Sequence, residues 1–298
     1  MPLKSWFKFI YLGLVWGSTF LWLELGLEEF GPITLNAMRL AVATLGLWIL
    51  VRITHTPFPS RQDWGKLFFL GIVNIAFPFV LITWSQQSIT SGLASILNST
   101  SPLFTVLLAL AFVTEDRLTS PRIIGLVCGF AGVVVLMAGQ VGSAEGNSLW
   151  GQGGVLLASI AYAVAVIYAR RKAAGIKPLT VAFGQSLVAN LVLWPLALWF
   201  ESPLVIPTKF VTWAMILWLG ILATCIGTAL YYALLNEVGP TRTTMVTYLF
   251  PLVGVLLGWI ILDEPLSWRL LVGGAMIVSG VALVNLSPVK SPLLTTER

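Results

Sequence analysis

Two charged side chains lie inside long apolar stretches of this sequence, where a charge is costly and usually functional. Glu24 is the only acidic residue within such a stretch, and Arg39 is the only basic one away from the ends of the stretches. A carboxylate and a guanidinium on adjacent helices can form a structural ion pair. A carboxylate at this depth can also bind a proton or the ammonium group of a substrate. The two residues are therefore predicted to serve either energy coupling or an ion pair.

Uncharged polar and aromatic side chains also fall near the middle of apolar stretches. They can hold a substrate, or they can join one helix to another. A phosphorylated substrate would call for several Lys or Arg side chains, so a zwitterionic or neutral metabolite with apolar bulk fits better. The predicted substrate-binding residues are Trp16, Ser18, Thr19, Asn74, Phe77, Asn98, Ser101, Tyr162, Thr224, Thr228, Thr247 and Tyr248.

Prolines inside apolar stretches can bend a helix, because proline lacks the backbone donor. Such bends can act as hinges between two conformations, or they can simply improve packing. The candidate hinges are Pro78, Pro102, Pro195 and Pro251.

The elements that carry these side chains follow from composition. Of the 298 residues, 57% are hydrophobic and 10% are charged, whereas soluble proteins have about 25% charged residues. A membrane-spanning helix needs about 20 apolar residues. We therefore expect an all-α integral membrane protein with ten transmembrane helices. The ten apolar runs are 7–27, 33–51, 65–86, 92–113, 121–138, 150–169, 179–200, 210–235, 241–262 and 268–286.

The distribution of Lys and Arg predicts the orientation of these helices. If the N-terminus is cytoplasmic, 14 of the 17 basic residues lie in inside segments, and only Lys209 and Arg269 lie outside. Both termini are thus expected in the cytoplasm of a prokaryotic cell, with the chain in the inner membrane. The net charge of +5 is then a topology signal, and no nucleic-acid partner is expected.

The sequence contains an internal repeat. Pro102 and Glu115 match Pro251 and Glu264, each pair separated by 149 residues. The match resumes at a separation of 148 residues, where Gly125 pairs with Gly273 and Gly132 pairs with Gly280. We therefore expect two five-helix repeats, 1–140 and 141–298, in one integrated membrane domain. An odd number of spans per repeat makes the second copy inverted in the membrane, as in many transporters.

These motifs resemble those of EamA-type transporters of the drug/metabolite transporter superfamily. The resemblance rests on Trp16-Gly17-Ser18-Thr19-Phe20, on Pro32 followed by Arg39, and on the repeated proline, acidic and glycine positions. It covers nearly the whole chain and departs from the family at the inserted Asp116. It implies a carrier for amino acids, other metabolites or drugs. It also implies a cavity bounded by the first, third, fourth, sixth, eighth and ninth helices, which carry the predicted substrate-binding residues.

We therefore predict a secondary transporter, an exporter or a facilitator, for small metabolites such as hydrophobic or aromatic amino acids. The alternative is a proton-coupled exporter of drugs or other neutral metabolites. A membrane enzyme or a channel fits less well, because the single histidine, His55, lies in a loop and no filter-like sequence is present. Without a metal-ligand cluster or a G-x-x-x-x-G-K-[ST] motif, no metal or other cofactor is expected. The expected partners are a small-molecule substrate, the lipid bilayer and protons, with no obligate protein partner.

Overall fold

A computed structural model describes residues 2–112, 119–138, 148–203, 207–238, 243 and 245–286, and the regular elements within these ranges are all helical. In the first half these are α1 (Leu3–Gly17), α2 (Thr19–Gly26), α3 (Pro32–Ile53), α4 (Trp64–Leu70), η1 (Gly71–Ala76), α5 (Phe77–Gln86), α6 (Ser91–Asn98), α7 (Ser101–Phe112) and α8 (Ser120–Ala138). In the second half they are α9 (Leu149–Lys172), α10 (Pro178–Phe200), α11 (Phe210–Leu217), η2 (Trp218–Ile226), α12 (Gly227–Val238), η3 (Met245–Tyr248), α14 (Leu249–Ile261) and α15 (Trp268–Leu286).

Several of these helices join end to end into membrane-length spans. Eight described spans are long and apolar enough to cross a bilayer, and two shorter apolar helices, Met245–Ile261 and Trp268–Val284, occupy the expected ninth and tenth runs. This confirms the prediction of an all-α, multi-pass membrane protein. The repeat residue Glu115 lies outside the described residues.

The third and eighth spans share a local distortion. In the third span α4 passes through the π-helix η1 into α5, and in the eighth span α11 passes through the π-helix η2 into α12. A π-helix is rare and often lies at a functional site. Adding the repeat separation of 149 residues to η1 places it inside η2, so the distortion occurs at matching positions in the two halves.

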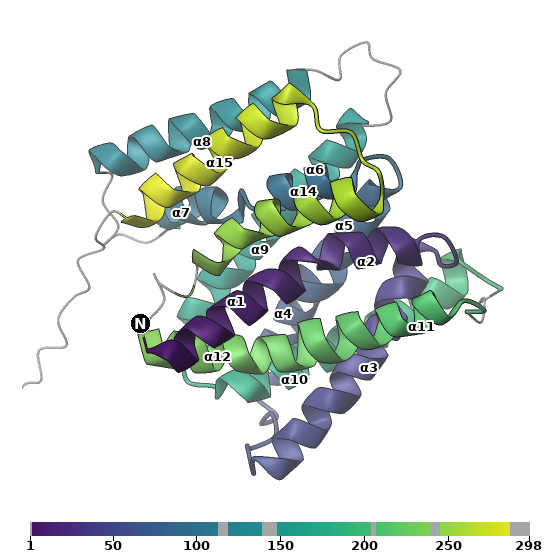
Figure 1. The fold of residues 1–298 in the computed structure, drawn as a ribbon. Helices are drawn as coiled ribbons and strands as arrows, with labels where there is room; N and C mark the ends of the chain where they lie inside the picture. Colours follow the sequence, from purple (N-terminus) through teal and green to yellow (C-terminus); the bar gives the residue numbers. More distant parts are fainter. Residues whose placement is uncertain are drawn as a thin grey trace, which may run out of the picture.

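The helices pack in a reciprocal pattern (Figure 1). The second span packs against the seventh, the fourth against the ninth, and the fifth against the tenth. The sixth span, α9, contacts α5 and α7, and its counterpart in the first half, α1, contacts α12 and α14. Exchanging the two halves therefore reproduces the same set of contacts.

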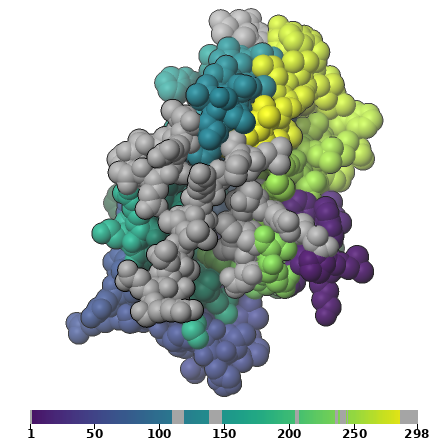
Figure 2. Space-filling view, turned by 90° about the vertical axis from the view of Figure 1, so that its left-hand side faces the viewer, coloured from purple at the N-terminus to yellow at the C-terminus, as the bar shows by residue number. Residues whose placement is uncertain are grey.

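The helices α8 and α15 cross most closely at glycines, and they lie side by side at the top of Figures 1 and 2. A Cβ on Gly125 would lie 2.6 Å from the carbonyl oxygen of Gly280, and one on Gly132 would lie 2.7 Å from that of Gly273. The earlier glycine of α8 thus meets the later glycine of α15, so the two helices run antiparallel. A glycine at each crossing point lets the two backbones approach closely.

The four prolines occupy different local settings. Pro78 is buried and is the second residue of α5, which follows η1, and Pro102 is the second residue of α7, just after the chain leaves α6. Pro251 is the third residue of α14, which follows the 3₁₀ turn η3. By contrast, α10 continues through Pro195 to Phe200. Three of the four prolines therefore lie at helix discontinuities. Their role as hinges remains a prediction.

Candidate functional site

Arg39 lies in the interior of the bundle, on α3. Its side chain is buried, and its Nε donates a hydrogen bond of 3.2 Å to Thr224 Oγ1 of η2. The guanidinium carbon lies 4.2 Å from the centre of the Phe79 ring of α5. Tyr162 of α9 lies near enough to interact electrostatically with the guanidinium. Arg39 thus lies where the second, third, sixth and eighth spans meet.

Glu24 and Arg39 do not form the ion pair that was one of the two alternatives for these residues. Glu24 Oε2 instead accepts a hydrogen bond of 3.2 Å from Gln86 Nε2, and the described residues provide no carboxylate partner for Arg39. The spacing of the two residues gives their depth in the membrane, but it does not give the side of the helix on which each one lies. Arg39 lies on the side of α3 that faces η2.

The π-helix η2 explains why Thr224 can reach Arg39. The Thr224 hydroxyl donates to the carbonyl oxygen of Leu219, five residues earlier, at 2.8 Å, so its lone pairs remain available to Arg39 Nε. The close packing of α3 on η2 also brings Thr224 within reach of Arg39. It depends on Gly220, where a Cβ would lie 2.9 Å from the Arg39 carbonyl oxygen and 2.8 Å from Val42 Cβ. A larger residue at Gly220 would separate the two spans and disrupt the contact.

The first span also meets η2 through polar contacts. Ser18 lies at the break between α1 and α2, and its hydroxyl accepts a hydrogen bond of 3.1 Å from Trp218 Nε1. The rings of Trp22 and Trp218 lie 5.4 Å apart. Trp16 Nε1 donates to the carbonyl oxygen of Ala223 at 2.7 Å. The predicted residues Trp16, Ser18 and Thr224 are therefore brought together around η2.

A related contact occurs at η1 in the first half. Asn74 Nδ2 donates to Gln185 Oε1 of α10 at 3.1 Å. A Cβ on Gly71 would lie 2.8 Å from the Gln185 carbonyl oxygen and 2.8 Å from Val188. This reproduces the contact of Gly220 with Arg39 and Val42. Gln185 therefore occupies the position in the second half that Arg39 occupies in the first.

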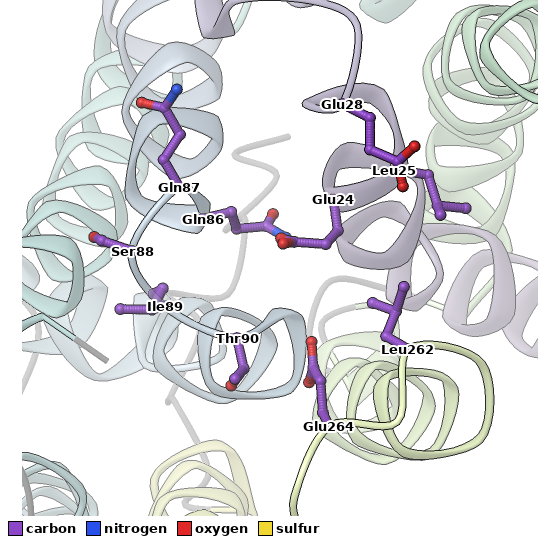
Figure 3. Close-up of a pocket in the computed structure, with 10 residues that line it drawn as sticks. All are labelled: Glu24, Leu25, Glu28, Gln86, Gln87, Ser88, Ile89, Thr90, Leu262 and Glu264. Atoms are coloured by element: carbon purple, nitrogen blue, oxygen red, sulfur yellow. The ribbon is translucent and has the colours of Figure 1, made fainter. Parts of the chain in front are cut away.

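A cavity of about 380 Å³ opens where the first and third spans end and the fourth begins (Figure 3). The amide of Gln86 and the carboxylate of Glu24 point toward one another in it, and Gln86 Nε2 also donates to the Phe20 carbonyl oxygen at 2.9 Å. Glu264, which follows α14, accepts from the backbone N–H groups of Ser91 and Gly92 at 2.6 and 2.9 Å. Its carboxylate therefore binds the first turn of α6, where the positive end of the helix dipole stabilises a negative charge. We call this cavity the outer pocket, after the side that it faces in the orientation proposed below.

The remaining predicted residues lie in several environments. Phe77 is 43% exposed and lines an apolar surface groove with Trp84 and Leu196, so its predicted place in the interior is wrong. Asn98 has a buried Oδ1 without a hydrogen-bond partner in the described structure. The hydroxyls of Thr19, Ser101 and Tyr248 donate to the carbonyl oxygens of Val15, Asn98 and Val281. Thr228, Thr247 and Tyr162 are half-buried.

Sequence reasoning missed several residues that complete these contacts. Gln86 is the last residue of α5 and Glu264 follows the end of α14, where hydropathy marks a boundary rather than a site. Gln185 carried a usable signal, because the stretch that starts at Pro178 follows the stretch that starts at Pro32 at a constant separation of 146 residues. Within the described residues, no group of three His, Cys, Asp or Glu side chains could hold a metal ion.

Comparison with known proteins shows the family. The model of the EamA-like transporter family matches residues 4–138 and, separately, 149–286. An uncharacterised transporter of Archaeoglobus fulgidus is 25% identical over 95% of this chain and 99% of its own length. The inner membrane transporter YedA of Escherichia coli, also uncharacterised, is 26% identical over 95% of this chain and 93% of its own length.

Another relative has a more specific name. A probable terminal-alkyne amino-acid exporter of Streptantibioticus cattleyicolor is 26% identical over 95% of this chain and 93% of its own length. One crystal structure superposes with a TM-score of 0.68 at 18% identity, covering 95% of this chain and 96% of that one, and shares the fold. Since the family model covers both halves, the chain belongs to the EamA-like transporter family.

Proposed function

We propose that the protein is a secondary transporter, an exporter or a facilitator, that moves small metabolites by alternating access between two inverted five-helix repeats. The observation that carries the proposal is the reciprocal packing, with Gly125 on Gly280 and Gly132 on Gly273. Two similar halves that meet in this way can exchange conformations, which opens a central site alternately to the two sides of the membrane. The separate family matches to 4–138 and 149–286 support the two repeats.

Amino acids, hydrophobic or aromatic ones among them, are the proposed substrates. The interior offers hydrogen-bonding groups from Ser18, Asn74 and Thr224, together with the rings of Trp22 and Phe79. Such a mixture suits a molecule with one polar end and one apolar end. The name of the Streptantibioticus relative supports the same class.

The proposed location is the inner membrane of a prokaryotic cell, with both termini in the cytoplasm and all ten helices spanning. The distribution of basic residues supports this orientation. Lys8 near the N-terminus forms an ion pair with Glu237 near the end of α12, so these two helix ends lie on the same side. The same orientation puts the outer pocket, at the far end of the first span from Lys8, on the external side.

Counterflow in proteoliposomes tests the proposal. Vesicles are preloaded with a mixture of unlabelled amino acids, and a labelled aromatic amino acid is supplied outside. Transient, saturable accumulation of label is expected, because a carrier exchanges its substrates while a channel only equilibrates them. Folded protein that gives no accumulation would contradict the amino-acid assignment. Label that enters without overshoot and without saturation would contradict the carrier.

Proton coupling is a second candidate property, and the outer pocket favours it. Glu24 is half-buried there, and its carboxylate bonds an amide rather than a cation. A carboxylate without a cation partner can take up and release a proton without breaking an ion pair. This observation supports the alternative of a proton-coupled exporter of drugs or other neutral metabolites.

A further inference from the structure

Arg39 is a buried cation whose described contacts do not balance its charge. Its Nε bonds the neutral hydroxyl of Thr224, and its guanidinium packs on the ring of Phe79. Within the described residues, neither Nη atom donates to an acceptor and no carboxylate pairs with the guanidinium. The charged end of the side chain thus retains unused hydrogen-bond donors inside the bundle.

A guanidinium cannot escape this situation by losing its proton, because arginine stays charged in proteins. An isolated charge in a low-dielectric interior is very costly, so buried charges are normally paired. The contact with Phe79 recovers only part of that cost. The planar pair of Nη atoms matches the two oxygens of a carboxylate. A carboxylate that arrives with a ligand would therefore supply the missing partner.

The second half of the protein shows that the fold does not require a cation at this place. Gln185 occupies the equivalent position, with its backbone against Gly71 as that of Arg39 lies against Gly220. Its neutral amide accepts a hydrogen bond from Asn74, and the contact needs no charge. The two halves therefore share the packing, while the first half alone carries the charge at this position. This difference points to ligand recognition rather than to support of the helices.

We propose that Arg39 binds the carboxylate of the transported substrate through its two Nη atoms, with Thr224 holding Nε and Phe79 stacked on the guanidinium. The inference rests on the proposed transport function and narrows the substrate to molecules with a free carboxylate. An amino acid meets this requirement, whereas the corresponding amino-acid amide does not. Arg39 thus selects substrates by charge, whereas the surrounding apolar and aromatic groups select by size.

The test compares two labelled probes, phenylalanine and phenylalaninamide, which differ only at the carboxylate. Counterflow of both is measured for the wild-type protein, Arg39→Gln, Arg39→Lys and Arg52→Gln. The Arg39→Gln variant places in the first half the residue that the second half already has, so the fold should accept it. Arg52 is an exposed residue near the other end of α3, and its variant is a matched control for the same change of charge on the same helix.

We expect the wild-type protein and Arg52→Gln to prefer the acid over the amide by at least tenfold. Arg39→Gln should lose this preference while still moving the amide, and Arg39→Lys should keep only part of it, because an ammonium lacks the two-pronged geometry. If Arg39→Gln is folded and keeps the full preference for the acid, the inference is overturned while the transporter assignment stands. A loss that affects acid and amide equally would also overturn it, since that pattern indicates a structural role.

A second measurement separates this inference from the proposed function. If the wild-type protein transports neither probe, the amino-acid assignment fails, and the unfolding temperature in detergent is then followed while 3-phenylpropanoate or its amide is added. Stabilisation of the wild-type protein by the acid alone, absent in Arg39→Gln, would support a carboxylate site. Equal stabilisation of both proteins, or none of either, would contradict it.

Discussion

Glu24 and Gln86 join the first and third spans at the outer pocket through a hydrogen bond between a carboxylate and an amide. Replacing Glu24 by Gln preserves the shape of the side chain and removes its proton-binding site. We expect Glu24→Gln to abolish the dependence of transport on a pH gradient, because Glu24 is the only acidic residue inside the expected spans. Transport driven by a pH gradient in proteoliposomes checks this.

Glu28→Gln is the matched control. Glu28 lines the same pocket but is exposed and pairs with Lys209, so its loss should leave the pH dependence intact. If Glu24→Gln responds to a pH gradient as the wild-type protein does, Glu24 is not the coupling residue. A structural role would then remain for its bond to Gln86.

Glu29 provides a separate residue-level prediction about stability. Hydrogen bonds from the hydroxyls of Thr208 and Thr212 and from the backbone N–H groups of Thr208 and Lys209 lower its pKa from 4.5 to about 2. A lowered carboxyl pKa stabilises the folded state above the unfolded pKa, and this contribution is lost as the pH falls through the folded value. The stabilisation should be complete above pH 4.5 and should fade toward pH 2.

The unfolding temperature in detergent, measured at pH 6 and at pH 3, checks this prediction. The wild-type protein should lose more stability across that interval than Glu29→Gln, which has no charge to lose. Equal losses in the two proteins would show that the hydrogen bonds to Glu29 do not contribute to acid sensitivity.

At the scale of elements, the crossing of α8 and α15 depends on the absence of side chains. A Cβ on Gly280 would lie 2.5 Å from the Gly125 carbonyl oxygen and 2.6 Å from the Gly129 nitrogen. Gly280→Ala should therefore force the helices apart and destabilise the protein by about 1–3 kcal/mol, as overpacking usually does. Thermal unfolding in detergent measures the effect.

Gly153→Ala is the natural comparison, because nothing lies within 4 Å of a Cβ at this position of α9. There the change should stabilise the protein by about 0.5–1 kcal/mol, since alanine loses less backbone entropy than glycine in a helix. If both variants shift the unfolding temperature in the same direction, the close approach of α8 and α15 is not a source of stability.

Hydropathy predicted the helices well and their internal geometry poorly. The expected run 33–51 lies within α3, Pro32–Ile53, because the length of an apolar run directly indicates the length of the span. The expected continuous run 7–27 is interrupted at Ser18, and no apolar pattern indicates η1 or η2. Such distortions arise from contacts between helices, which a single span does not encode.

For three of the predicted residues the sequence indicated a place in the interior, but it did not indicate their hydrogen-bond partners. Trp16, Ser18 and Thr224 do gather around η2, because polar groups in a span avoid lipid. The partner of Arg39 was missed, because the rotation of each helix about its axis depends on its neighbours. For the same reason the sequence predicted an interior position for Phe77, whereas its side chain faces an apolar surface groove.

At the scale of the whole molecule, the proposed orientation predicts which loops face which side. We expect a cysteine at Arg61 to be protected in intact cells from a membrane-impermeant thiol reagent, and a cysteine at Lys209 to react. The Lys209 side chain forms only an exposed ion pair with Glu28, and such pairs contribute little to stability. Labelling is measured in a background without Cys128 and Cys225, the two native cysteines.

Opening the cells before labelling provides the control, since both positions should then react. The opposite pattern in intact cells would reverse the proposed orientation and put the outer pocket on the cytoplasmic side. Reaction at both positions in sealed cells would contradict a topology in which these two loops lie on opposite sides.

The matching π-helices have a consequence for the rotational phase of their spans. One additional residue in an α-helix advances every following side chain by about 100° around the axis. The third and eighth spans can therefore present one face to their neighbours before η1 or η2 and a different face after it. In the eighth span this change of phase occurs where Thr224 meets Arg39. A single-residue deletion there would leave enough apolar length to cross the membrane, yet it would turn one end of the span out of register with the rest of the bundle.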